Sequence, residues 1–274
     1  MKRRLLTLLF ALTLLAPTLA LTACEKEETL SPENAPTLDA PPANDGQDEE
    51  EKEENGAISV PTPQNAQYIR CTGDSVNLRK GASASHDVVG TAKKGEIYAV
   101  VEKQGGWYKT YYRNQTVYIS ASYTALLSLQ ENESDKVEAV INEGYKLLGV
   151  PYVYGAVRLH DGKGNMLGGF SVQKFDCSSL VQYVFYKGAG KTLEVTTRTQ
   201  VKQGKYVAKN DIQRGDCIFF TNESRQHLSG IERVGHVAIY LGDDYILHTA
   251  SDYARIEKMT ASRWKFYIET RRFI

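Results

Sequence analysis

The sequence predicts an α+β fold for the C-terminal half of the chain, preceded by a small all-β domain. Between Tyr68 and Leu129, short runs with strand-like alternation are separated by turn sequences containing Gly, Lys and Asn. From Ser134 to Leu148 the apolar residues recur at helical spacing, and apolar strand-like runs follow after residue 215. Helices first and antiparallel strands afterwards are typical of an α+β domain.

The charges of the chain are distributed very unevenly. The formal net charge of the 274 residues is zero, but residues 1–23 carry three basic residues and no acid. Residues 24–54 carry twelve acids against two lysines, and residues 55–274 carry a net charge of +7. The composition, 42% hydrophobic and 24% charged, excludes a collagen-like, wholly disordered or polytopic membrane protein. The chain therefore consists of three segments of different charge.

Residues 1–23 have the composition of a secretory signal. A basic start, Met1–Arg4, precedes the apolar run Leu5–Leu21, and small residues follow. The alternatives are a single membrane-spanning helix and an ordinary cleaved signal. The apolar run is about 17 residues long, which is at the lower limit for a helix that spans a bilayer. The sequence Leu21-Thr22-Ala23-Cys24 resembles the lipobox of bacterial lipoproteins. That resemblance implies lipidation at Cys24 and a mature protein that is extracytoplasmic and lipid-anchored to the bacterial cell membrane.

Residues 24–65 are predicted to be a disordered acidic and proline-rich linker. They contain six of the eight prolines, the acidic run Asp48–Glu54 and almost no large apolar residue. Such a segment buries too little apolar surface to offset the entropy of ordering. A solvated spacer is expected, with an acidic interaction tail as the alternative.

Five strand-like runs define the all-β domain: Val76–Arg79, Val88–Thr91, Ile97–Val101, Trp107–Tyr112 and Val117–Ile119. Because an open sheet this small would leave unpaired edges, we expect the strands to close into a small barrel. Over residues 66–130 the ordered motifs resemble the bacterial SH3-like domain: Val76-Asn77-Leu78-Arg79, Val89-Gly90-Thr91, Lys94-Gly95, Gly106-Trp107-Tyr108 and Val117-Tyr118-Ile119. The resemblance implies a module that binds cell-wall material or positions a neighbouring catalytic domain.

The C-terminal domain, residues 135–274, opens with a helix that is expected to have Ser134 as its N-cap and to end at Gly149. A second helix is expected to begin near Asp176. Strands are expected at 216–220, 234–241, 245–249 and 268–273. The glycine-rich stretch Arg158–Lys174 between the two helices predicts a mobile loop beside the second helix, with His160 and Asp161 as solvated turn residues.

Cys177 is the candidate nucleophile. It lies in the first turn of the second predicted helix, where unpaired backbone N–H groups favour a thiolate and can bind an oxyanion. His236 stands at the start of one predicted strand and His248 at the end of the next, so a hairpin would bring the two imidazoles together. One ring can then deprotonate the thiol while the other orients it. Cys71 and Cys217 are expected to be buried small residues, with a disulfide between them as the alternative.

Five motifs follow one another in the C-terminal half: Pro151-Tyr152-Val153-Tyr154-Gly155, Phe175-Asp176-Cys177-Ser178-Ser179-Leu180-Val181, Arg214-Gly215-Asp216, Gly235-His236-Val237-Ala238-Ile239-Tyr240 and His248-Thr249-Ala250-Ser251. In this order they resemble the NlpC superfamily of papain-like bacterial cell-wall cysteine peptidases. The resemblance implies Cys177 as nucleophile, His236 as general base and His248 as the orienting residue of a papain-like α+β fold. It also implies that Asp176, Ser178 and Tyr152 contact the substrate, the first two at the peptide's N-terminal end.

The resemblance implies hydrolysis of peptidoglycan stem peptides or muropeptides, at the bond between γ-D-Glu and the following diamino acid, through a thioester acyl-enzyme. The alternatives are a catalytically inactive cell-wall-binding lipoprotein and an acyl transferase on the same scaffold. No cofactor or metal site is expected, because neither the cysteines nor the five histidines have metal-ligand spacing. We expect a monomer that binds the membrane through its lipid anchor and binds no nucleic acid.

Overall fold

The computed structural model describes residues 65–132 and 134–274, all within one compact unit of the chain. The predicted signal segment, Cys24 and the linker before Asn65 therefore lie outside the described residues. Within the described ranges, no helix is both long and apolar enough to cross a membrane.

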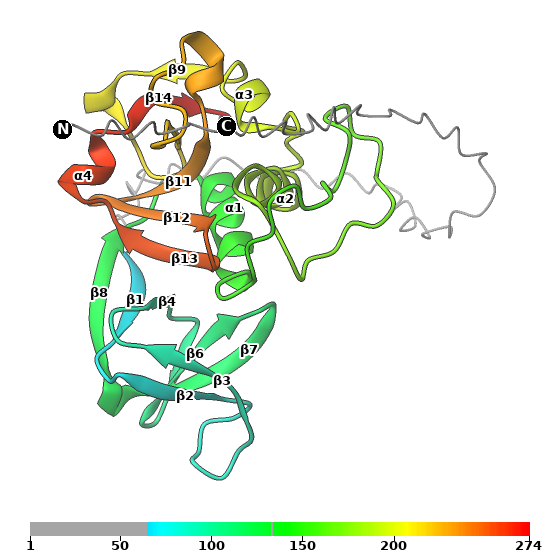
Figure 1. Cartoon of the computed structure of the whole chain (residues 1–274). Helices are drawn as coiled ribbons and strands as arrows, with labels where there is room; N and C mark the ends of the chain where they lie inside the picture. Colours follow the sequence, from blue (N-terminus) through cyan, green and yellow to red (C-terminus); the bar gives the residue numbers. More distant parts are fainter. Residues whose placement is uncertain (1–64, 133) are drawn as a thin grey trace, which may run out of the picture. The chain divides into compact units, whose positions relative to one another are not determined.

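Residues 65–130 consist of short strands and one 3-10 turn (Figure 1). The elements are β1 (Asn65–Cys71), β2 (Ser75–Arg79), β3 (Val88–Lys93), β4 (Ile97–Ala99), β5 (Glu102–Gln104), β6 (Trp107–Tyr112), β7 (Gln115–Ser120), η1 (Ala121–Tyr123) and β8 (Thr124–Gln130). The five predicted runs fall on β2, β3, β4, β6 and β7, which confirms them. The sequence did not predict β1, β5 and β8. All three residues of β5 are exposed, so this strand has no alternation by which to recognise it.

The strand pairing does not confirm the expected closed barrel. An antiparallel sheet contains β3, β2, β7, β6 and β5 in that order, whereas β8, β1 and β4 belong to a second, nine-stranded sheet. That sheet continues from β4 into the C-terminal strand β13 (Tyr253–Lys258) through the pair Ile97 and Ile256. Instead of closing into a barrel, the N-terminal strands thus cover part of an exposed sheet edge by pairing β4 with β13.

The two long helices form one packed pair. They are α1 (Asp135–Lys146) and α2 (Cys177–Ala189). Ser134 occupies the N-cap position of α1 as predicted, but its side chain makes no capping hydrogen bond. The apolar stripe of α1 is buried, and so are the first nine residues of α2. The helices approach closely at Gly188, where a Cβ atom would lie 2.5 Å from the backbone of Val140. The shorter helices are α3 (Thr197–Gln200), η2 (Lys209–Asp211), η3 (Gly230–Arg233) and α4 (Ala261–Trp264).

The rest of the nine-stranded sheet lies next to α2. Its order is β8-β1-β4-β13-β12-β11-β10-β14-β9, and α2 packs on β11 and β12. Besides β13, the C-terminal strands are β9 (Lys205–Val207), β10 (Cys217–Phe220), β11 (His236–Gly242), β12 (Tyr245–Ala250) and β14 (Tyr267–Arg272). The four predicted strands correspond to β10, β11, β12 and β14, whereas β9 and β13 were not predicted. Cys71 and Cys217 are free and buried, as expected for small core residues.

A buried arginine ties the N-terminal strands to the C-terminal domain. Arg214 forms a bidentate ion pair with Glu138 of α1, at 2.7 and 2.8 Å. Its guanidinium also donates to the hydroxyl of Tyr68 in β1 (3.0 Å) and of Tyr145 in α1 (2.9 Å). Because a buried guanidinium is tolerated only when its donors are satisfied, these contacts hold β1, α1 and the turn before β10 in one arrangement.

Candidate active site

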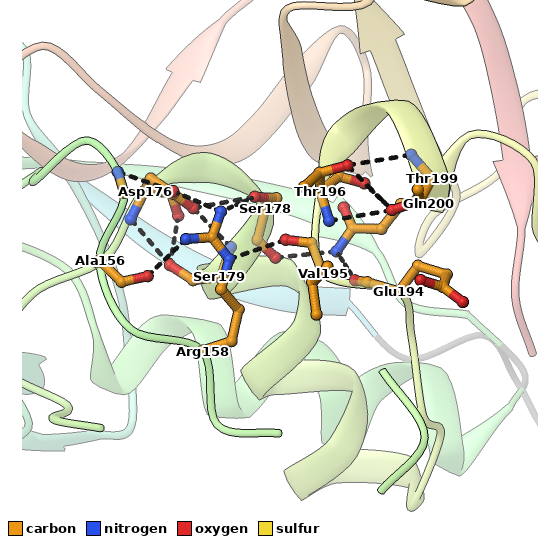
Figure 2. A network of polar contacts seen from close by, with 11 residues as sticks. Ala156, Arg158, Asp176, Ser178, Ser179, Glu194, Val195, Thr196, Thr199 and Gln200 are labelled. Atoms are coloured by element: carbon orange, nitrogen blue, oxygen red, sulfur yellow. Dashed lines mark hydrogen bonds and ion pairs between the residues drawn. The ribbon is translucent and has the colours of Figure 1, made fainter. Parts of the chain in front are cut away.

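The cysteine singled out by the sequence is the first residue of α2. Asp176 is the N-cap: its Oδ1 accepts the backbone N–H of Ser179 at 2.8 Å, and the Ser179 hydroxyl accepts the N–H of Asp176 at 2.9 Å. This reciprocal capping box satisfies two of the unpaired donors at the helix start (Figure 2). The local sequence therefore fixes where the helix begins and, with it, where the thiol of Cys177 is presented.

Cys177 is buried, with 8% of the residue exposed. Burial, with a smaller contribution from the neighbouring Asp176, raises the pKa of the Cys177 thiol to about 12. The backbone N–H groups of Val237, Ser178 and Cys177 itself act in the opposite direction but do not outweigh burial. The expectation of a thiolate at this helix start is therefore wrong for the resting site, because desolvation exceeds the effect of the helix terminus. A base is needed to take the proton.

The two histidines form a pair beside the thiol. The register of β11 and β12, with Ile239 opposite Leu247, makes His236 and His248 diagonal neighbours on one face of the sheet. His236 Nε2 lies 2.9 Å from His248 Nδ1, and the ring planes meet at 78°. This contact leaves His236 Nδ1 available to the thiol, and both Cys177 and His236 line the same cavity. Burial lowers the pKa of both rings, so they are neutral in the resting site.

A carboxylate that no sequence motif indicates lies behind His248. Glu257 of β13 has its Oε1 3.3 Å from His248 Nε2, although the direction does not meet hydrogen-bond geometry. Arg255 Nε contacts Glu257 Oε2 at 2.9 Å, and Arg263 pairs with Glu257 Oε1. Burial opposes ionisation of Glu257, but His248 and the two arginines outweigh it and lower its pKa. The alternation of Tyr253–Lys258 was the sequence signal that could have revealed this strand.

A cleft passes the thiol and widens into a recess on either side. The two recesses have volumes of about 620 and 430 Å³ and share Tyr152, Cys177, Asn222 and Gly235. Tyr152 thus lies beside the candidate nucleophile. Asp176 and Ser178 line only the smaller recess, together with Arg158. All three candidate substrate residues border the cleft.

The stretch Arg158–Lys174 lies beside the active site as expected, but its first residues are packed. Arg158 forms an ion pair with Asp176 at 2.9 Å. The prediction that His160 is solvated is wrong: the residue is fully buried, its ring lies 5.1 Å from that of Tyr186, and its Nδ1 accepts the N–H of Gly162. Burial lowers the pKa of His160. Among the described residues, no group of three or more His, Cys, Asp and Glu could hold a metal ion.

The buried neutral rings of His160, His236 and His248 predict an acid-sensitive fold. Their pKa values lie below the ordinary value of 6.5, so as the pH falls below about 6.5 the unfolded chain takes up protons that the folded chain does not. The free energy of unfolding is expected to fall by at most about 1.4 kcal/mol per pH unit and ring. Urea unfolding between pH 7.5 and 5 measures this slope. His160→Gln should reduce it, and His227→Gln, at an exposed position, should not.

Two family models match the chain. Residues 149–272 match the NlpC/P60 family, and residues 74–125 match the bacterial SH3 domain. The second match ends before α1 begins, and the first covers the candidate nucleophile and both histidines. The matched ranges lie inside the predicted domains at 66–130 and 135–274.

Individual relatives are similar at modest identity. The chain is 27% identical over 198 residues to a gamma-DL-glutamyl hydrolase of Bacillus subtilis (strain 168), covering 70% of this chain and 43% of that protein. It is 34% identical over 110 residues to a gamma-D-glutamyl-L-lysine dipeptidyl-peptidase of Bacillus cereus, covering 40% of this chain and 27% of that protein. Among solved structures, an NLP/P60 family protein from Staphylococcus aureus, described as similar to lipoprotein, is 28% identical with a TM-score of 0.42. The match covers 56% of this chain and 46% of that one. The chain spans less than half the length of these relatives.

The family matches agree with the resemblance that the motifs around Cys177, His236 and His248 carry. Residues 149–272 are an NlpC/P60 family domain, and residues 74–125 before it are a bacterial SH3 domain.

Proposed function

We propose that the protein is a cell-wall cysteine endopeptidase that hydrolyses peptidoglycan stem peptides at the bond between γ-D-glutamate and the following diamino acid. One observation carries the proposal: a thiol at a helix start and the neutral His236 border the same cleft, and His236 contacts a second neutral histidine, His248, behind it. Two relatives named for γ-glutamyl hydrolysis, from Bacillus subtilis and Bacillus cereus, support the choice of bond.

The residues suggest the following sequence of steps. His236 takes the proton of Cys177 as the sulfur attacks the carbonyl carbon of the scissile amide. Backbone N–H groups at the start of α2 stabilise the oxyanion that forms. His236 then gives the proton to the leaving amine, and the acyl group remains on Cys177 as a thioester. A water molecule, deprotonated by His236, hydrolyses the thioester and restores the thiol.

His248 and Glu257 orient the base. The contact between His236 Nε2 and His248 Nδ1 holds the ring of His236, and Glu257 lies against the other nitrogen of His248. Because a ring fixed in one orientation loses no entropy on reaching the transition state, Glu257 acts as a positioning residue.

Glu257→Gln is expected to lower kcat about tenfold, in the range of effects of residues that orient a functional ligand. The carboxylate raises the pKa of His248 and of His236, so its removal should also move the acid limb of the kcat/KM profile to lower pH. Glu269→Gln removes a comparable partner of Arg271 on β14 and serves as the control. An unchanged acid limb in Glu257→Gln would contradict the positioning role.

Mass spectrometry of digests tests the proposed function. The full chain is incubated with defined stem peptides, and the expected products are an L-Ala-D-Glu dipeptide unit and a peptide that begins with the diamino acid. Cleavage at another bond would contradict the specificity, and intact peptides would contradict the activity.

We further propose that the protein acts outside the cytoplasm, anchored to the membrane by lipid on Cys24. The basic start, the apolar run and Leu21-Thr22-Ala23-Cys24 support this location. Metabolic labelling with a fatty acid in a bacterial host is expected to mark the wild-type chain and not Cys24→Ala. Equal labelling of both would contradict lipidation at this residue. In this arrangement the SH3 domain docks or positions the peptide, and the protein acts as a monomer.

A further inference from the structure

Arg158 occupies the smaller recess of the cleft in a fixed position. Its Nη2 donates to Asp176 Oδ2 at 2.9 Å and to the Ser178 hydroxyl at 3.1 Å (Figure 2). Its Nε donates to the carbonyl of Val195 at 2.8 Å, and its Nη1 to the carbonyl of Ala156 at 2.7 Å. The guanidinium is thus bonded on three sides, and only 18% of the side chain is exposed. Four contacts of this kind are typical of a built ion pair rather than a chance surface contact.

The carboxylate that Arg158 contacts has no acceptor site left. A carboxylate offers about four lone-pair positions. Oδ1 of Asp176 accepts from Ser178 (3.0 Å) and Ser179 (2.8 Å), and Oδ2 accepts from Gly155 (3.2 Å) and Arg158. The Ser178 hydroxyl is also used twice, as a donor to Asp176 and as an acceptor from Arg158.

The other wall of the recess holds Ser178 and Val195 in place. Gln200 donates from its side-chain amide to the carbonyl of Ser178 at 3.0 Å and to that of Glu194 at 2.9 Å. Val195 is followed by Thr196, the N-cap of α3, whose hydroxyl accepts the N–H of Thr199 (Figure 2). Two of the four acceptors of Arg158, Asp176 and the Val195 carbonyl, therefore adjoin helix starts that are capped.

We propose that Arg158 is a specificity-determining residue that makes this recess accept the acylated N-terminus of a peptide and reject a free ammonium. The inference rests on the proposed function and deepens it. A buried carboxylate beside the nucleophile, 6% exposed, would be the natural partner of a substrate ammonium. Here that partner is already bound, and an incoming ammonium would meet the guanidinium instead. Rejection follows from the repulsion of like charges at short distance.

An acylated end fits the same place. A guanidinium has five N–H groups, and four hydrogen bonds from Arg158 are present among the described residues. The remaining N–H, on Nη1, is available to the carbonyl oxygen that an acyl group adds to the peptide's N-terminus. Asp176 and Ser178 would then act on the substrate through Arg158 rather than by direct contact. The substrate class is a stem peptide whose first amino group is in amide linkage, as it is before release from the cell wall.

The test compares one peptide with two N-termini. The full chain is assayed with L-Ala-γ-D-Glu-L-Lys-D-Ala bearing either a free or an acetylated amino group. The wild type is expected to have a kcat/KM at least tenfold higher for the acetylated form. Arg158→Gln frees Asp176 to bind an ammonium, so the preference should fall at least tenfold, mainly through a lower KM for the free-amine peptide. Arg158→Lys keeps the positive charge and should keep the preference.

Two controls separate the possible failures. Arg198→Gln removes an arginine from the same recess that pairs with Glu232 rather than with Asp176, and the preference should persist. Calorimetry with the Cys177→Ala protein measures binding of both peptides without turnover. Equal or tighter binding of the free-amine form would overturn the inference while cleavage still supported the proposed function. Tighter binding of the acetylated form without any cleavage by the wild type would support the inference and overturn the proposed function.

Discussion

Cys177→Ala is expected to lower kcat/KM for stem peptides by at least about 10⁴-fold, the scale on which loss of a covalent nucleophile acts. Within the part of the chain that the structure describes, no other thiol can substitute, because Cys71 and Cys217 are buried in β1 and β10. The fold should persist, since the first turn of α2 is held by the capping box of Asp176 and Ser179 and not by the thiol. Peptide cleavage is followed by mass spectrometry and folding by circular dichroism.

Cys217→Ala provides the matched control. Cys217 is also buried, and burial likewise raises the pKa of its thiol, but it lies on β10 and lines neither recess of the cleft. Turnover should remain close to that of the wild type. Retained cleavage in Cys177→Ala would contradict the assignment. Binding of purified wall by a wild type that cleaves nothing under reducing conditions would instead indicate a binding protein.

His236→Ala is expected to lower kcat/KM by about 10²–10⁴-fold, the range for removal of a general base. The effect should be large here because burial raises the pKa of the Cys177 thiol to about 12, so very little thiolate exists at neutral pH without a base. Rates of cleavage and of alkylation of Cys177 by iodoacetamide are the two measurements, and both should fall.

Substitutions of His236, His248 and Glu257 are expected to lower kcat/KM by different amounts. His236 lines the same cavity as the thiol, His248 contacts His236, and Glu257 lies 3.3 Å from His248. The losses should therefore decrease in that order, with Glu257→Gln the mildest because it acts through two rings. Imidazole added to His236→Ala should restore part of the activity. A His236→Ala variant that cleaves as fast as Glu257→Gln would contradict its role as the base.

Much of the local structure could be predicted from the sequence because its causes are local. Asp176 and Ser179 cap a helix three residues apart, Ser134 starts another, and the alternation in residues 76–79 and 107–112 produces β2 and β6. The two histidines were predicted to meet because a hairpin with a short turn places the start of its first strand beside the end of its second. Strand β5 was not predicted, because all of its residues are exposed and show no alternation of buried and exposed side chains.

The wrong predictions concern the burial of His160 and the pKa of the Cys177 thiol, which both depend on residues distant in the sequence. His160 looks like a loop residue, yet it is buried against Tyr186, which follows it by 26 positions. The thiol of Cys177 was expected to be acidic because helix starts favour thiolates, but strands β11 and β12 pack over α2 and desolvate it. No pattern in the loop or helix sequence encodes the depth of burial that decides both cases.

The candidate chemical groups could be recognised in the sequence: a cysteine at a capped helix start, two histidines on adjacent strands, and the motifs that relate the domain to a family. The tertiary structure sets the surroundings of these groups. It brought Glu257 against His248 through the pairing of β12 and β13, and it placed Arg158 on Asp176 across a chain separation of 18 residues. The physical reason is that motifs reflect short-range backbone geometry, whereas charge, burial and selectivity depend on which distant side chains share the same low-dielectric space.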